Sequence, residues 1–360
     1  MYKNRPYRGR REERNRRIRQ VLLVVVVVFA VLFSVGVFQD LSLSDLSHVG
    51  DSKNPAASQG SQTSEPEVPV GSHTIYLPAS SLDSSAVQRL IAMKDAGLIN
   101  GVITDLKNQD GTLNYPSQIS YLSGRNIATQ AASTLPTSIQ TLKDAGVSVI
   151  GRIYCYHDNT FAHINKDATA CTKKGFTWLD NRSKRHLDPY SDTSADYIGQ
   201  IIGEAADLGC SEVILDDFSF PTNGQVQYIY YDDQGLSKSE ILAQRLQQFV
   251  QIGQEKKIEV SLYLASPTEN GGIQADAGQD TATFYDVVSH LYAPLSTQST
   301  QGEKDFAQAL SQITGDADKL IPIYTDLQAF PKRFTQEGSP DDYSFDPVNN
   351  GYTLTGLYNG

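Results

Sequence analysis

Eight strand-like segments that alternate with helix-like segments predict an α/β fold, a (β/α)8 TIM-like barrel. The alternation runs from about residue 74 to residue 359, which is long enough for a barrel of roughly 250 residues. A doubly wound open sheet is the alternative, but the first strand is not followed by the GxGxxG sequence of dinucleotide-binding folds. The barrel is expected to be incomplete at its last βα units, because residues 332–350 show no apolar period.

The predicted strands are short apolar runs rich in β-branched residues, at residues 74–77, 101–107, 147–156, 211–218, 258–265, 285–295, 320–327 and 352–359. The predicted helices have apolar residues at helical spacing, at residues 84–99, 137–146, 193–209, 237–257 and 303–313. Gly146 and Gly209 mark helix ends, since glycine readily adopts the left-handed conformation that follows a helix. Ser237 or Ser239 is the expected cap of the fourth helix.

The amino terminus predicts a membrane anchor. Residues 1–20 carry nine Lys or Arg and two Glu, a net charge of +7, and the apolar residues 21–38 follow without a charge. A membrane-spanning helix needs about 20 apolar residues, and basic residues on its amino side favour a cytoplasmic amino terminus. A cleaved signal peptide is the alternative, although no clear small-residue cleavage site follows the apolar stretch.

A disordered linker is predicted at residues 39–72, which are rich in Ser, Pro and Gly and have no apolar period. The folded domain is therefore expected at residues 73–360, outside the cell, in a single-pass protein of the cell membrane. Beyond the basic head the chain carries a net charge of −18, which argues against nucleic acid as a partner.

The cysteines and histidines give no sign of a metal site. Three cysteines and six histidines are scattered along the chain without zinc-binding spacing, and neither a metal nor a cofactor is expected. A disulfide is allowed outside the cell, and one between Cys155 and Cys171 would close a short loop.

Acidic residues follow several predicted strands at their carboxyl ends, where TIM barrels hold their active sites. The clearest case is SEVILDDFSFP, residues 211–221, in which an apolar strand ends on Asp216 and Asp217. Because desolvation makes a buried charge costly, this pattern favours a site that uses the two carboxylates. The alternative for Asp216 is a turn-forming residue at a strand end.

The residues predicted at this mouth suit glycoside hydrolysis, because an oxocarbenium-like transition state needs one acid and one negatively charged partner. The catalytic candidates are Asp216, Asp217 and Asp105. The candidates for substrate binding are Lys107, Arg152, Tyr154, Asp158, Tyr292 and Gln328, with His157 and Asp326 nearby. Asp105 and Lys107 are two residues apart on one strand, and both a structural ion pair and a sugar-binding pair fit that spacing.

Several motifs, taken in order, resemble the bacterial domain family described as "putative glycosyl hydrolase". They are GVITDLKNQDG, GRIYCYHD, HLDPYS, EVILDDFSFP, AGQD, SHLYAPL and LQAF, and the resemblance spans about residues 74–358. It implies a TIM barrel related to glycoside hydrolases, often tethered outside the membrane. By position it also implies functional roles for Asp105, Lys107, Arg152, Asp216, Tyr292 and Gln328. The family's strand-4 arginine is Ser219 here, and its aromatic residue beside the aspartate is Asp217.

The sequence thus predicts a membrane-anchored glycoside hydrolase that acts outside the cell on a polysaccharide or cell-envelope glycan. A non-catalytic carbohydrate-binding barrel and an interaction scaffold of the envelope are the alternatives. Paired carboxylates would favour the enzyme, an isolated aspartate the binding protein, and a large exposed apolar patch the scaffold.

Overall fold

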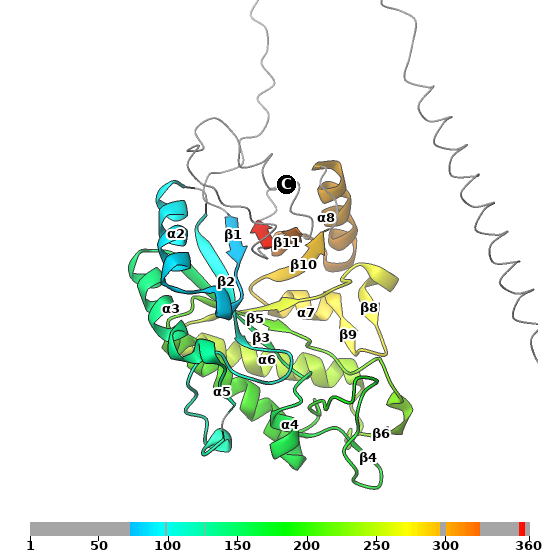
Figure 1. Ribbon diagram of the computed structural model, residues 1–360. Helices are drawn as coiled ribbons and strands as arrows, with labels where there is room; N and C mark the ends of the chain where they lie inside the picture. The colour runs from blue at the N-terminus through cyan, green and yellow to red at the C-terminus, as the bar shows by residue number, and fades with distance from the viewer. Residues whose placement is uncertain (1–72, 98, 126, 296–299, 325–352, 357–360) are drawn as a thin grey trace, which may run out of the picture. The chain divides into compact units, whose positions relative to one another are not determined.

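The computed structural model describes residues 73–97, 99–125, 127–295, 300–324 and 353–356 (Figure 1). The predicted basic head, membrane span and linker lie outside these residues, as do Asp326 and Gln328. Within the described part of the chain, no helix has both the length and the apolar character needed to cross a bilayer.

Seven parallel strands form a curled sheet (Figure 1). They are β1 (His73–Tyr76), β2 (Gly101–Lys107), β3 (Ser148–Tyr154), β5 (Glu212–Asp216), β7 (Glu259–Tyr263), β10 (Leu291–Leu295) and β11 (Leu320–Tyr324). β12 (Thr353–Gly356) pairs antiparallel with β1 and β11 and closes the barrel in the described part of the chain. The predicted α/β class is confirmed, and the sheet has the form of a TIM-like barrel whose last strand runs in the opposite direction.

Helices follow most of the strands and surround the sheet (Figure 1). They are α2 (Ser84–Asp95), α3 (Leu135–Asp144), α4 (Phe161–Ile164), α5 (Asp192–Leu208), α6 (Lys238–Lys256), α7 (Thr281–Val287) and α8 (Thr300–Thr314). Short 3-10 turns lie at Ala79–Ser81, Ser120–Leu122, Gln130–Ser133, Lys166–Ala168, Val226–Tyr228 and Glu269–Gly272.

Local sequence signals explain where the helices begin and end. Ser237 caps α6 in a capping box with Glu240, which decides between the two serines predicted for that role. Gly209 ends α5 in the left-handed conformation, with φ of 96°. The strand predicted at residues 285–295 is wrong in its first residues, because Asp280 accepts a hydrogen bond from the Thr283 N–H and caps α7.

Two short sheets extend the loops at the carboxyl ends of the barrel strands. β4 (Cys171–Thr172) pairs with β6 (Ile229–Tyr230), joining the loop after β3 to the loop after β5. β8 (Ile273–Gln274) pairs with β9 (Gln279–Asp280) in the loop after β7. These additions enlarge the end of the barrel where the predicted site lies.

The barrel interior has an apolar layer with a polar layer above it. Ile103, Ile150, Ile214, Tyr292 and Ile321 pack together inside the sheet. Because alternate residues of a strand face the same side, the next inward positions on β2, β3 and β5 are Asp105, Arg152 and Asp216. The apolar layer therefore closes the barrel beneath these three charged side chains.

Candidate functional site

Arg152 lies at the centre of the polar layer. Its Nε donates a hydrogen bond of 2.6 Å to Asp105 Oδ1, and its Nη2 donates one of 2.9 Å to the Tyr76 hydroxyl. That hydroxyl donates in turn to Asp105 Oδ2 at 2.5 Å. Arg152 Nη1 is 3.7 Å from Asp216 Oδ2, so one guanidinium contacts both carboxylates. The guanidinium also lies over the rings of Tyr76 and Tyr154, at 4.5 and 4.9 Å from their centroids.

Asp216 is the last residue of β5, and only 7% of it is exposed. Burial, together with the negative charge of Asp217, raises the pKa of Asp216 from its usual range to about 7, although Arg152 acts in the opposite direction. Asp216 is consequently half protonated near neutral pH, which suits a group that donates a proton.

Asp217 occupies a backbone conformation that is uncommon for residues other than glycine, with φ of 47°. Its peptide N–H donates a hydrogen bond of 2.7 Å to Asp216 Oδ1. Because the strand has ended and the backbone turns here, the side chain of Asp217 faces the neighbouring pocket. Both aspartates therefore lie at one mouth, which the alternation of a continuing strand would have prevented.

Polar partners hold the Asp217 carboxylate. Gln109 Nε2 donates to its Oδ2 at 2.8 Å, and His157 Nδ1 lies 3.6 Å from the same oxygen. Burial acts to raise the pKa of Asp217, but the interactions with His157 and Gln109 outweigh it and bring the pKa below the usual value. The pKa values of the two adjacent carboxylates are thus shifted in opposite directions.

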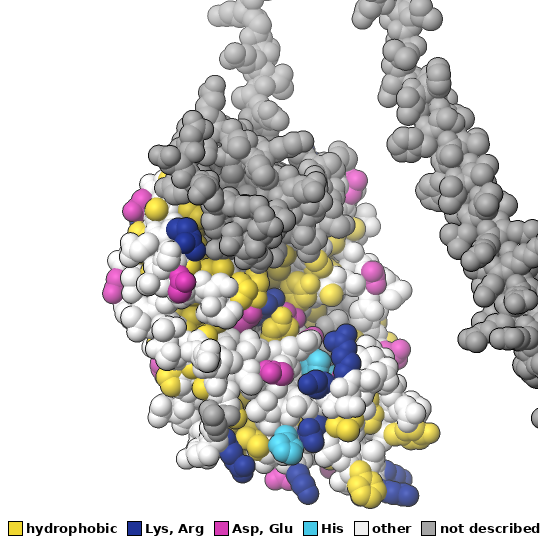
Figure 2. Space-filling model, viewed as in Figure 1, with side chains coloured by type: hydrophobic (Ala, Val, Ile, Leu, Met, Phe, Trp, Pro, Cys, Tyr) yellow, Lys and Arg dark blue, Asp and Glu magenta, His cyan; other side chains and the backbone are white. Residues whose placement is uncertain are grey.

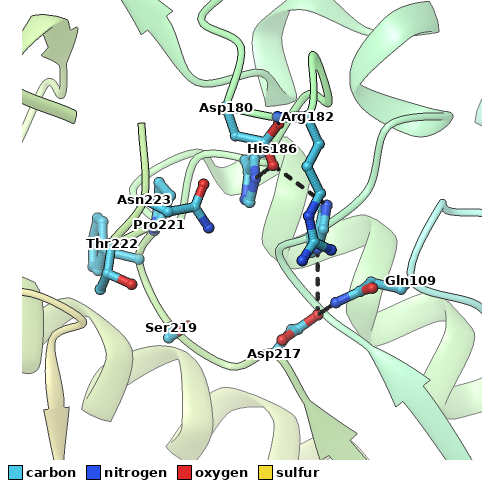
Figure 3. Close-up of a pocket in the computed structure, with 11 residues that line it drawn as sticks. Gln109, Asp180, Arg182, His186, Asp217, Ser219, Pro221, Thr222 and Asn223 are labelled. Atoms are coloured by element: carbon cyan, nitrogen blue, oxygen red, sulfur yellow. Dashed lines mark hydrogen bonds and ion pairs between the residues drawn. The ribbon is translucent and has the colours of Figure 1, made fainter. Parts of the chain in front are cut away.

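A pocket of about 220 Å³ lies beside Asp217 (Figure 3). Its lining residues are Gln109, His157, Asp180, Arg182, His186, Asp217, Ser219, Phe220, Pro221, Thr222 and Asn223. In Figure 3 the Arg182 side chain extends from the loop above toward Asp217 and Gln109. On the face shown in Figure 2, acidic, basic and histidine side chains lie close together below an apolar area.

Two histidines stack in this pocket. The rings of His157 and His186 have centroids 4.4 Å apart and are inclined by 5°. His186 Nε2 is 3.3 Å and His157 Nε2 is 4.0 Å from Asp180 Oδ2. The histidines are scattered in the sequence, but the loop after β3 folds back and brings these two together.

Lys107 and Asp158, both predicted to bind substrate, form a buried ion pair with each other. Lys107 Nζ is 3.0 Å from Asp158 Oδ2, and the two side chains are 1% and 0% exposed. Lys107 also donates to the Tyr154 carbonyl, and Asp158 accepts from the Phe161 N–H at 2.6 Å. These contacts place both side chains beneath the surface of the site, where they support it.

Asp105 and Lys107, two residues apart on β2, do not form an ion pair with each other. The register between β2 and β3 shifts between these two residues, so that Asp105 lies opposite Arg152 and Lys107 lies opposite Ile153. Asp105 contacts Arg152, whereas Lys107 contacts Asp158. The ion pair expected between Asp105 and Lys107 is therefore wrong, and each residue belongs to a separate ion pair.

The remaining predicted residues are distributed over different depths. Tyr154 is half-buried under the Arg152 guanidinium. Tyr292 is 1% exposed and lies in the apolar layer beneath the mouth. Gln328 is outside the described residues.

Sequence reasoning missed four residues of the site, Tyr76, Gln109, Asp180 and His186. Two of them had a usable signal: Gln109 lies in GVITDLKNQDG and His186 begins HLDPYS, both in motifs already singled out. Cys155 and Cys171, which were considered as a disulfide, are both free thiols.

Comparison with known proteins identifies the family. Residues 74–287 match the model of the family described as "Putative glycosyl hydrolase domain". No curated protein matches the chain.

Three solved structures are among those to which the chain is similar. A hypothetical protein from Ruminiclostridium thermocellum is 24% identical, with a TM-score of 0.47, over 52% of this chain and 95% of that one. An exo-β-N-acetylglucosaminidase from Vibrio harveyi is 13% identical, with a TM-score of 0.43, over 68% of this chain and 40% of that one. Ega3 from Aspergillus fumigatus, in complex with galactosamine, is 12% identical, with a TM-score of 0.42, over 79% and 86%. With the family model covering more than half of its length, the chain belongs to the "Putative glycosyl hydrolase domain" family.

Proposed function

We propose that this protein is a glycoside hydrolase that cleaves a polysaccharide or cell-envelope glycan by carboxylate acid/base chemistry. One arrangement carries the proposal: two consecutive carboxylates at the barrel mouth lie in different surroundings, Asp216 beside Arg152 and Asp217 beside Gln109 and His157. These surroundings shift the pKa values of the two carboxylates in opposite directions. Environments that separate the pKa values of two neighbouring groups are how active sites assign acid and base roles.

The different surroundings of the two carboxylates suggest different catalytic roles for them. Asp216, with its raised pKa, donates a proton to the oxygen of the leaving sugar. Asp217 stays ionised and acts either on the anomeric carbon or on a water molecule. Arg152 is fixed by Asp105 and limits how far the pKa of Asp216 can rise. Tyr76 completes this support through its hydrogen bonds to Arg152 and Asp105.

The surroundings of the pair suit a sugar. The pocket beside Asp217 is lined by amides, hydroxyls and charged groups, which can hydrogen-bond sugar hydroxyls. Tyr228 and Tyr230, in the loop after β5, are 59% and 52% exposed and offer faces on which a sugar ring can stack. These features also suit a barrel that binds carbohydrate without cleaving it, so turnover has to be tested separately from binding.

The proposal includes a location outside the cell membrane. The basic residues 1–20 followed by the uncharged residues 21–38 support an anchor with its amino terminus in the cytoplasm. Protease added to intact cells should then remove the folded domain and leave the first 20 residues protected. Recovery of the whole chain as a soluble cytosolic protein would contradict this location.

The experiment on catalysis compares the wild type with Asp216→Asn on a panel of polysaccharides and cell-envelope glycans, measuring the release of reducing ends. The substitution keeps the side-chain volume and the oxygen that accepts from the Asp217 N–H, and it removes only the charge and the proton chemistry. We expect turnover to fall about 100-fold or more, with glycan binding retained. Asp95→Asn, at an exposed position on α2, is the matched control and should keep full activity.

Three outcomes would change the interpretation. Full activity of Asp216→Asn would remove Asp216 as the acid and direct attention to Asp217 and Asp105. Binding without turnover in both proteins would indicate the non-catalytic carbohydrate-binding barrel. No binding of any glycan would favour the interaction scaffold.

A further inference from the structure

Three metal-binding side chains converge in the pocket beside Asp217. His157 and His186 each offer an imidazole nitrogen and Asp180 offers a carboxylate oxygen, and these atoms lie within 4.8 Å of one another. We propose that the three residues bind a divalent transition-metal ion, with Zn²⁺ as the best match. Two imidazole nitrogens and one carboxylate oxygen form a ligand set that zinc accepts in proteins.

Asp180 is held in the orientation that a ligand needs. Its Oδ1 accepts hydrogen bonds of 2.8 Å from the N–H groups of Arg182 and Lys184, which fixes the carboxylate. Its Oδ2 faces both imidazoles, at 3.3 Å from His186 Nε2 and 4.0 Å from His157 Nε2. The side chain is only 1% exposed, so its charge has little water around it and gains from a nearby cation.

His157 has a carboxylate behind its second nitrogen. Its Nδ1 lies 3.6 Å from Asp217 Oδ2. Histidines that bind metal usually donate their other ring N–H to a carboxylate or carbonyl, which leaves the first nitrogen free for the ion. The same contact would link the ion to Asp217, one residue from Asp216.

The pocket gives the ion a path of entry and further ligands. It is open to solvent, has a volume of about 220 Å³ and includes Gln109, Ser219 and Asn223 in its lining. With three protein ligands, a zinc ion keeps a position for water or for a hydroxyl group of a bound sugar. The lining contains two carboxylates and one guanidinium, a balance that favours a cation.

Binding requires a small rearrangement. The His157 and His186 rings are nearly parallel, with centroids 4.4 Å apart, whereas a metal ion lies in the plane of each imidazole that binds it. The rings must therefore turn out of their stack when the ion enters. The ring of Trp178 packs edge-on against that of His186, with the ring centroids 5.5 Å apart. Because Trp178 is the one tryptophan of the chain, its fluorescence should report this movement.

The experiment titrates Zn²⁺ into the purified full-length protein after treatment with a chelator. We expect one zinc per chain by metal analysis, a saturable change in Trp178 fluorescence and a rise in the melting temperature. Asp180→Asn and His157→Gln should lose binding. Asp217→Asn, which removes the carboxylate behind His157, should weaken it about 10- to 100-fold. Asn keeps the oxygen that accepts from Arg182 and Lys184, so the Asp180 variant should still fold.

A second cluster at the opposite end of the barrel supplies the control. The ligand atoms of Glu212, Glu259 and His290 also lie within 4.8 Å of one another. The substitution His290→Gln should nevertheless leave zinc binding unchanged. Failure of the wild type to bind zinc, or equal binding by wild type and both the Asp180 and His157 variants, would overturn the proposal. Loss of binding in His290→Gln alone would assign the ion to the other end. None of these measurements uses a glycan, so the result stands apart from the proposed hydrolase activity.

Discussion

The peptide N–H of Asp217 donates a 2.7 Å hydrogen bond to the carboxylate of Asp216, the residue before it. The two side chains nevertheless have different surroundings. Asp216 lies inside the barrel mouth beside Arg152, and Asp217 lies in the pocket beside Gln109 and His157. The left-handed backbone at Asp217 produces this separation.

The pH dependence of hydrolysis should be bell-shaped. On the alkaline side, kcat/KM should fall with a midpoint near pH 7, because Asp216 loses the proton that it donates. On the acid side, activity should persist below the usual range of aspartate before Asp217 is protonated. Initial rates across pH 3–9 on any cleaved glycan test this. Rates that have not begun to fall by pH 9 would show that another group is the acid.

Asp216 should make the protein less stable as the pH rises. Its folded-state pKa of about 7 is above the unfolded value of about 3.9. Between these values the unfolded chain releases a proton that the folded protein keeps, so the free energy of unfolding falls with pH, by a few kcal/mol at most. Asp216→Asn lacks this titration. Its melting temperature should exceed that of the wild type at pH 8, and the difference should shrink toward pH 4.

A matched control for this measurement is Asp95→Asn, whose melting curve should follow that of the wild type at every pH. If Asp216→Asn is less stable than the wild type at pH 8, the carboxylate stabilises the strand end, and the structural interpretation of Asp216 is correct.

The Lys107–Asp158 ion pair should contribute strongly to the stability of the folded protein around the site. Lys107→Met leaves the Asp158 carboxylate buried without its counter-charge, and we expect a loss of about 3–5 kcal/mol in the free energy of unfolding. The double variant Lys107→Met/Asp158→Asn should recover part of that loss, because no uncompensated charge remains. Urea unfolding of the two single variants and the double variant measures the coupling. A Lys107→Met variant of normal stability but weak glycan binding would indicate that Lys107 binds substrate, as the sequence predicts.

A shortened chain that begins at Gly71 should fold cooperatively, since residues 39–72 have no apolar period with which to form a core. We expect a single sigmoidal unfolding transition and the same melting temperature as the full-length protein. Aggregation of the shortened chain, with normal folding of the full chain, would place the domain boundary earlier.

The alternation of strand and helix signals was enough to predict the barrel, because period and capping are local properties. The segments at residues 101–107 and 193–209 correspond to β2 and α5 within a residue. The reversal of β12 was not predictable, since a short apolar run does not encode its direction. The helix α7 was missed, and its last residues were assigned to a strand, because its apolar residues continue toward β10.

For the site, strand ends identified Asp105, Arg152 and Asp216 as neighbours, and they share contacts through one guanidinium. The stack of His157 and His186 could not be read from the chain, because it depends on how a long loop folds back. The burial of Lys107 was equally hidden, since it follows from a register shift between two strands.

The single peptide bond between Asp216 and Asp217 has a mechanical consequence. When two carboxylates lie on separate strands, thermal motion of the strands relative to each other changes the distance between the carboxylates. Here any displacement of β5 carries both, and covalent geometry limits how far their spacing can drift. Heating or loosening the barrel should therefore disturb the contacts of this pair with its neighbours before it disturbs the pair itself.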